Sequence, residues 1–183
     1  MWYTKHITQQ SGCMSAFDPS SVNLAALPPV VRESNFRLTD ADNEIFIPWA
    51  ETNGLLKPAG AGLYYNLVCD PNWENHLVAA VLMAQPKAVL VGPSVLHGFG
   101  CQTQIPHALW VASPQPLPTN MIGVKWVAKP HSWFREFAPG TTLYGMPSLT
   151  PQQALDDAQA FPIAAWLPDE DDIDMHEVRR FSL

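Results

Sequence analysis

Proline is the residue that most constrains how this chain can fold. Eighteen prolines occur among 183 residues. Proline lacks a backbone N–H and its ring clashes with the preceding helical turn, so it interrupts helices and central strands. Prolines at this density predict short elements and exclude a long helix bundle or a coiled coil. Apolar residues make up 47% and charged residues 15%, which indicates a globular chain with a core and excludes disorder over most of its length.

The segment before residue 70 predicts a short helix followed by a two-stranded ribbon. Pro48 to Asn53 is typical of a short helix, because proline suits the first helical position and Gly54 suits the left-handed position after the last turn. Residues 55–57 and 63–68 predict two strands, and the intervening residues 58–62 form a turn-rich link of hairpin length.

The remainder of the chain predicts a small mixed α/β unit. Asp70 and Pro71 are expected to open a helix that runs to Ala84, is apolar on nearly all sides and is therefore buried at the centre of a second domain. The segments 88–91, 107–112 and 121–127 predict strands. Thr150-Pro151-Gln152-Gln153 is a capping box, which predicts a helix from Pro151 to about Ala160.

Charge is distributed unevenly along the sequence. The net charge is −7, yet residues 1–150 carry 8 basic and 9 acidic side chains, whereas residues 151–183 carry 2 and 8. Acids at 169–174 precede a short apolar pattern and predict the start of a terminal helix, where they complement the helix dipole. A nearly neutral body does not exclude nucleic acid, and the middle stretch, 71–150, is slightly basic.

Cysteine usage and the apolar runs indicate a reduced, cytoplasmic, soluble protein. Three cysteines, an odd number at wide spacing, do not suggest a disulfide framework. The first residues lack the apolar centre of a signal peptide, and the longest apolar run, 77–84, is too short to cross a bilayer.

Few residues form a pattern that predicts chemistry. Ser94 follows a predicted strand, but Leu96 stands where a nucleophile elbow needs glycine, so a helix cap is the better interpretation. His97, Cys101 and His107 lie within eleven residues without paired metal-ligand spacing, which favours packing over zinc. Aromatic and basic residues alternate only at Lys125-Trp126 and Trp133-Phe134-Arg135, where core packing is also favoured. These patterns predict no enzyme activity, no cofactor and no metal.

Two segments resemble AbiEi-type antitoxins. Asn53-Gly54-Leu55-Leu56 followed by Gly62-Leu63-Tyr64 is similar to the helix end and wing of that family. The order of features from Ala84 to Ala112, including Ser94-Val95-Leu96-His97-Gly98, resembles its linking helix, strand and following helix, and Ala154-Leu155-Asp156-Asp157 its late acidic helix.

The resemblance implies an α+β fold with an N-terminal winged-helix-like domain and a small mixed α/β domain. The expected organisation is an irregular arm over 1–20, a winged-helix-like domain over 21–70, an antitoxin-like α/β domain over 71–168 and an acidic helix or tail over 169–183. The family implies a transcriptional regulator of a type IV toxin–antitoxin pair. Such a protein binds operator DNA, possesses no cofactor, and counters a nucleotidyltransferase-like toxin without a stable complex.

The candidate DNA-binding residues are few, and this leaves two functions open. They are Arg32, Arg37, Trp49, Thr52, Asn53 and Lys57. Two or three phosphate contacts from one copy predict weak and salt-sensitive binding, which a homodimer on a two-fold site would double. The alternative is a protein-interaction module of the same descent that does not bind DNA, for which the acidic tail is the candidate surface. A small hydrolase or metalloenzyme is the third hypothesis.

Overall fold

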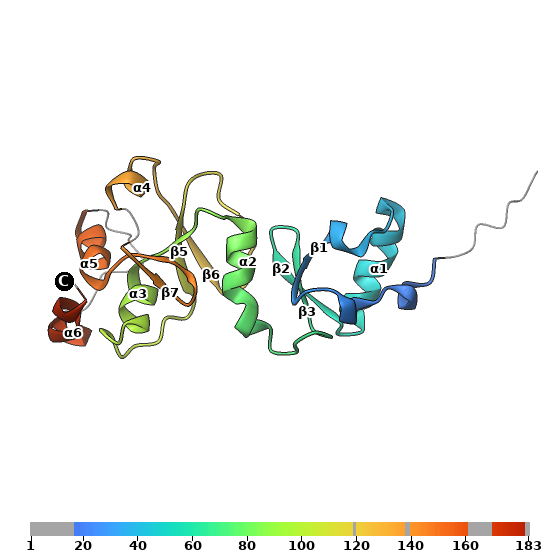
Figure 1. Cartoon of the computed structure of the whole chain (residues 1–183), viewed down its shortest axis with the longest axis horizontal. Helices are drawn as coiled ribbons and strands as arrows, with labels where there is room; N and C mark the ends of the chain where they lie inside the picture. Colours follow the sequence, from blue (N-terminus) through green and yellow to red (C-terminus); the bar gives the residue numbers. More distant parts are fainter. Residues whose placement is uncertain (1–16, 119, 138–139, 161–169, 182–183) are drawn as a thin grey trace, which may run out of the picture.

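The computed structural model describes residues 17–118, 120–137, 140–160 and 170–181. The fold is α+β, with a three-stranded sheet in the N-terminal part and a separate five-stranded sheet in the C-terminal part. The two parts follow one another along the long axis of the molecule, with one helix between them (Figure 1). Among the described residues, no helix combines the length and the apolar character needed to cross a bilayer.

The first sheet is antiparallel and has the order β1-β3-β2. Its strands are β1 (Val30–Arg32), β2 (Leu56–Gly60) and β3 (Leu63–Asn66). The helix α1 (Asp40–Thr52) covers one face. Successive strand residues point to opposite faces, so Val31 and Leu56 pack with Phe46 and Ala50 of α1. Single 3₁₀ turns complete this part: η1 (Pro19–Ser21), η2 (Leu24–Ala26) and η3 (Glu33–Phe36).

The expectation of a short helix from Pro48 to Asn53 was wrong, because α1 begins eight residues earlier. Thr39 caps the helix by accepting a hydrogen bond from the backbone N–H of Asp42 at 3.2 Å. Pro48 therefore lies inside the helix, where it removes one backbone hydrogen bond. Pro48 is on the exposed side of α1, which makes this loss tolerable. The helix does end where predicted, and Gly54 adopts the expected left-handed conformation with φ of +67°.

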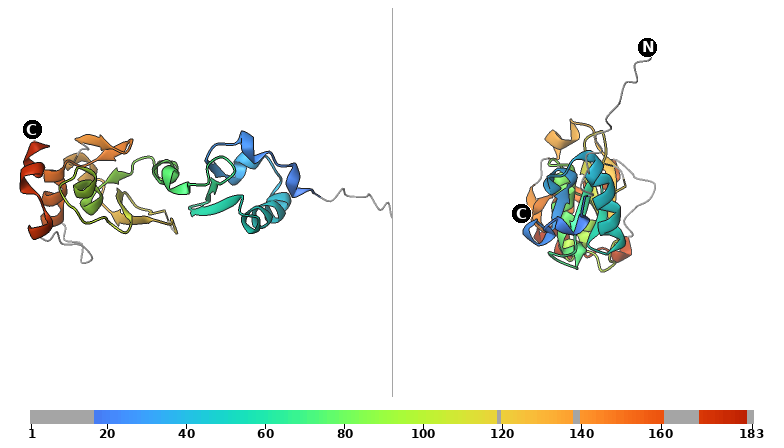
Figure 2. Two further views of the ribbon diagram at one scale, coloured as in Figure 1. Left: turned by 90° about the horizontal axis from the view of Figure 1, so that it is seen from below. Right: turned by 90° about the vertical axis from the view of Figure 1, so that its right-hand side faces the viewer.

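The helix α2 (Leu77–Ala84) lies between the two parts rather than at the centre of the second one (Figures 1 and 2). The predicted single helix from Asp70 is also wrong: Asp70 accepts from the backbone N–H of Asn72 at 2.8 Å, and a 3₁₀ turn, η4 (Trp73–His76), precedes α2. Only Ala80 and Val81 of α2 are fully buried. They belong to a core that also contains Val30, Leu63 and Tyr65 from the second face of the first sheet.

The hairpin β2–β3 is docked on the C-terminal part. The backbone N–H of Ile122 donates to the carbonyl oxygen of Ala59 at 3.3 Å. A Cβ placed on Gly60 would come within 2.2 Å of the carbonyl oxygen of Asn120, so only glycine allows this approach. Arg32 donates to the carbonyl oxygen of Met83 at 2.5 Å, near the end of α2. Backbone and side-chain contacts thus hold the two parts together.

The second sheet has the order β6-β5-β4-β8-β7 and mixes parallel and antiparallel pairs. The short apolar segment near residue 90 is the central strand, which agrees with the interior strand that the sequence predicts. The strands are β4 (Val89–Leu90), β5 (Leu109–Ser113), β6 (Val124–Ala128), β7 (Thr141–Leu143) and β8 (Met146–Ser148). The helices are α3 (Gly92–Gly98), α4 (Trp133–Glu136), α5 (Pro151–Ala160) and α6 (Met175–Arg180), with the 3₁₀ turn η5 (Glu170–Asp172).

Two helix starts agree with the predictions made from local residues. The side chain of Thr150 accepts from the backbone N–H of Gln153 at 3.3 Å, and the side chain of Gln153 accepts in return from the backbone N–H of Thr150 at 2.9 Å. This reciprocal pair is the predicted capping box. Asp174 caps α6 by accepting from the backbone N–H of His176 at 2.9 Å. Residues 1–16 of the predicted arm lie outside the described residues.

Candidate functional site

Three of the candidate DNA-binding residues lie at the C-terminal end of α1, and two of them use their polar side-chain groups locally. The hydroxyl of Thr52 donates to the carbonyl oxygen of Pro48 at 2.7 Å. The side-chain amide of Asn53 donates to the carbonyl oxygen of Trp49 at 2.8 Å. Trp49 is half-buried and packs on Phe46, with ring centroids 6.2 Å apart. The carbonyl oxygen of Trp49 also accepts from the backbone N–H of Asn53 at 3.0 Å, so the side-chain amide of Asn53 adds a second hydrogen bond at the end of the helix.

Arg32 and Lys57 lie on the side of the first sheet that meets α2. Arg32 holds the carbonyl oxygen of Met83, and the Nζ atom of Lys57 lies 3.7 Å from the centroid of the Trp73 ring. A cation this close to an aromatic face is held by the ring quadrupole. The structure therefore separates these two cations from the exposed surface of α1 and engages both within the molecule.

Arg37 is the candidate cation nearest to the start of α1, and it is exposed. It ends η3 in a left-handed conformation with φ of +56°. The helix that follows contains four acids and no basic residue: Asp40, Asp42, Glu44 and Glu51. Asp40, Glu44 and Glu51 are exposed, as is Ile45 at 52%. Acidic side chains repel phosphate, so the exposed surface of α1 is electrostatically suited to a basic partner.

Ser94 is not the helix cap that the sequence suggested, because Val91 occupies the N-cap position of α3. The helix α3 begins at Gly92, so Ser94 lies in its first turn, with 3% of its surface exposed. Its hydroxyl oxygen accepts from the backbone N–H of Trp110 at 2.8 Å and thereby ties α3 to β5. Within the described residues no histidine or carboxylate forms a hydrogen bond with this hydroxyl, although Ser94 lines the same cavity as His97 and His107.

The residues His97, Cys101 and His107 do not form a metal site. His97 and His107 line one cavity of about 360 Å³, and Cys101 lies outside that lining. No group of three or more potential metal ligands occurs in the part of the chain that the structure describes. Burial raises the pKa of the Cys101 thiol to about 11, which opposes the thiolate that metal binding or nucleophilic attack requires.

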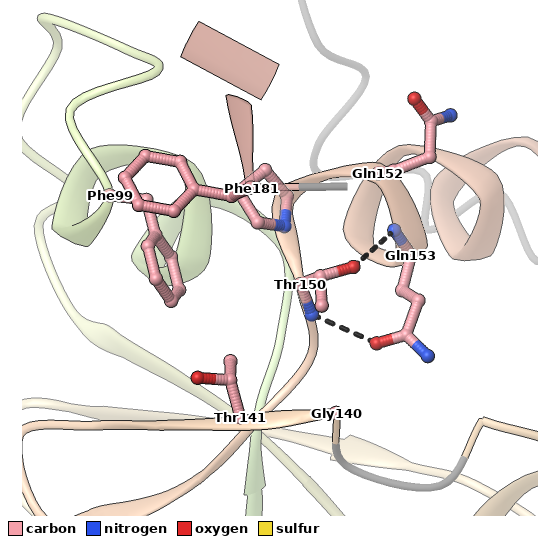
Figure 3. A pocket seen from close by; sticks show the side chains of 8 residues that line it. Phe99, Gly140, Thr141, Thr150, Gln152, Gln153 and Phe181 are labelled. Atoms are coloured by element: carbon pink, nitrogen blue, oxygen red, sulfur yellow. Dashed lines mark hydrogen bonds between the residues drawn. The ribbon is translucent and has the colours of Figure 1, made fainter. Parts of the chain in front are cut away.

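A larger cavity of about 520 Å³ lies at the start of α5 (Figure 3). The rings of Phe99 and Phe181, 4.9 Å apart between centroids, form one side, and Thr141 faces them across the opening. Gln153 is occupied by the capping box, and Gln152 points away from the cavity. Its lining contains no charged residue. The cavity is therefore large enough for a ligand, but its lining has no charged side chain that would bind one.

A buried charged network holds α5 through Asp157, and no pattern in the sequence predicts it. The Oδ1 atom of Asp157 accepts from Nζ of Lys129 and from the indole N–H of Trp133, both at 2.6 Å. The side chains of Lys129 and Asp157 are 3% and 6% exposed. The two residues are 28 positions apart, so no local spacing could have paired them.

Comparison with known proteins places the fold but not the function. No family model matches the chain, and no curated protein matches it by sequence. A solved structure, the RV2827C protein from Mycobacterium tuberculosis, aligns with a TM-score of 0.58 and 19% sequence identity, over 89% of this chain and 69% of that one. At this identity the likeness shows the fold alone, and the fold is α+β.

Proposed function

We propose that the chain is an antitoxin-like regulator of the AbiEi type, whose N-terminal module is a winged helix. The observation that carries the proposal is the path of residues 30–66. A strand, a short turn, the long helix α1 and a hairpin follow one another, the strand order is β1-β3-β2, and α1 covers one face of the sheet. This path is typical of winged helices. The separate C-terminal sheet also supports the proposal, because the resemblance implies a second domain.

In this proposal the protein works in the cytoplasm, without an activity of its own on a substrate. The helix α1 would enter the major groove of operator DNA, and Arg37 would contact a phosphate beside it. One such contact per copy predicts weak binding, so a homodimer on a two-fold site is expected. The C-terminal domain would counter a nucleotidyltransferase-like toxin.

A gel-shift titration on the DNA upstream of the gene tests the regulatory half, at low and at moderate salt. Arg37→Ala should weaken the shift and lower the salt slope by about one unit, because one phosphate contact is lost. Arg179→Ala is the matched control, since Arg179 is also exposed but lies on α6 at the other end of the chain. Equal effects of the two variants, or no shift by the native protein at low salt, would remove operator binding.

A second candidate function is a protein-interaction module that does not bind DNA. The observation that favours it is the acidic exposed surface of α1 together with the docked hairpin, which leaves the tip of the ribbon against Asn120 rather than free for a groove. A partner with a basic surface would complement the exposed acids of α1.

Charge reversal on α1 separates the two functions, because the sign of its effect differs. Glu44→Lys should strengthen a gel shift if α1 lies on DNA, since a repelled phosphate becomes an attracted one. The same variant should weaken association with a basic protein partner. Co-expression with the neighbouring gene tests the antitoxin half separately. Failure to relieve the toxicity of that gene product would exclude the antitoxin function, whatever the gel shift shows.

A further inference from the structure

A cavity of about 510 Å³ lies at one end of the second sheet and is lined by cationic and apolar side chains. It is found where β5 and β6 end and where β4 and β8 begin, as their pairing directions require. Ligands of open α/β sheets commonly bind beyond the carboxyl ends of neighbouring strands. The side chains that define its chemistry are Lys87, His131, Phe134 and Arg135, with Pro114 and Pro147 as apolar walls.

The cationic side chains of this cavity have no partner within the described ranges. Neither Lys87 nor Arg135 forms an ion pair or a side-chain hydrogen bond there, and His131 forms none either. Most other cations of the structure are engaged: Arg32 with Met83, Lys57 with Trp73, Lys129 with Asp157 and Arg180 with Glu177. The lining contains no carboxylate. Unpaired cations that converge on one cavity favour an anion within it.

The buried network around Asp157 fixes the segment that supplies most of these groups. Trp133 is held by Asp157 and contacts Phe134 edge to face, with centroids 4.8 Å apart. The helix α4 has only four residues and could not hold its own position. A buried ion pair contributes little net stability, and here it links α5 to the segment that precedes α4. Asp157 holds both Lys129 and Trp133, and these two residues flank His131 and precede Phe134 and Arg135 in the sequence. We infer that the network orients these three side chains in advance.

The shape and the apolar part of the cavity define the remainder of the ligand. Phe134 is half-buried and presents an aromatic surface, and the proline walls add apolar contact. A volume of about 510 Å³ suits a small organic molecule and exceeds what an inorganic anion needs. Phosphate groups pair well with Arg and Lys, and aromatic rings stack on bases of any sequence.

We propose that this cavity binds a free nucleotide, with the phosphate on Lys87, Arg135 and His131 and the base against Phe134. No residue of α1 takes part, so this site is independent of the proposed regulatory function and can fail or succeed without it. A nucleotide unit at the end of a single-stranded nucleic acid has the same chemistry, and the experiment distinguishes the two sources.

Isothermal titration calorimetry of the full chain tests the proposal with the four ribonucleoside monophosphates, inorganic phosphate and a single-stranded oligonucleotide. At least one monophosphate should bind with a Kd below about 1 mM. Lys87→Ala combined with Arg135→Ala should weaken binding at least about tenfold, because two charge-assisted contacts are lost. Phe134→Leu should weaken the monophosphate but leave binding of inorganic phosphate within about twofold.

The matched control is Lys125→Ala combined with Arg179→Ala, which removes the same two residue types from exposed positions outside this cavity. It should leave nucleotide affinity unchanged. The proposal is overturned if no monophosphate binds in the millimolar range, or if the control pair and the cavity pair weaken binding equally. A further outcome is that the oligonucleotide binds and the monophosphates do not displace it. That result would mean that Lys87 and Arg135 bind nucleic acid, and it would also overturn the free-nucleotide site.

Discussion

The contact between the hairpin β2–β3 and the loop near Asn120 can be measured with two glycine substitutions. Gly60 and Gly62 both have positive φ, +93° and +69°, so alanine is strained at either position. A Cβ on Gly60 would approach the backbone oxygen of Asn120 to 2.2 Å, whereas a Cβ on Gly62 meets no atom within 4 Å. The two substitutions therefore share the backbone strain, and only Gly60→Ala adds a collision with another part of the chain.

Left-handed strain costs about 1–2 kcal/mol, and forcing an extra methyl group against packed backbone costs about 1–3 kcal/mol more. We expect Gly60→Ala to lower the free energy of unfolding by about 2–5 kcal/mol and Gly62→Ala by about 1–2 kcal/mol. Urea titration monitored by tryptophan fluorescence measures both. A difference between the variants smaller than about 0.5 kcal/mol, within normal measurement error, would show that the hairpin is not docked on this loop.

Three further predictions follow from buried or capping groups. Asp157→Asn should lower the free energy of unfolding by about 3–5 kcal/mol, because it leaves the charge of Lys129 buried and unpaired. The control is Asp156→Asn, on the exposed side of α5, which should lower it by less than about 0.5 kcal/mol. The same urea titration measures both variants. Burial raises the pKa of the Cys101 thiol to about 11, so the thiol ionises at a lower pH in the unfolded chain than in the folded one. The thiol therefore stabilises the fold fully below about pH 8.5, and this stabilisation is lost as the pH rises toward 11. The urea midpoint should fall over this pH range, and it should fall less in Cys101→Ala. Thr150→Ala removes the cap of α5 and should cost about 0.5–2 kcal/mol, measured by thermal unfolding; an unchanged midpoint would contradict the capping role.

Elements set by neighbouring residues were predictable from the sequence. The capping box at Thr150 acts within one helical turn, and the start of α5 was placed correctly. The interior strand at Val89 was also predictable, because a strand covered on both faces needs an unbroken run of apolar residues. The end of α1 was also placed correctly, because Gly54 takes the positive φ that few other residues allow.

Features that depend on distant contacts were missed or misplaced. The rule that proline starts helices failed at Pro48, because the cap at Thr39 and the packing of Phe46 stabilise a longer helix around it. The helix α2 is apolar on nearly all sides because it contacts two sheets, not because it lies within one domain. The pair Lys129–Asp157 joins the end of β6 to α5, and the cavity at Lys87 and Arg135 brings together residues of β4, β8 and α4. No spacing along the sequence indicates either arrangement.

The two-sided burial of the first sheet also decides how this chain can be dissected. Val30, Leu63 and Tyr65 form an apolar surface that α2 and the C-terminal core cover. A truncation that stops before α2 would uncover that surface while leaving the cluster around α1 intact. Such a fragment is expected to self-associate, and its oligomeric state would reflect the cut rather than the native protein. Fragments that retain residues through Ala84 keep the helix that shields the sheet.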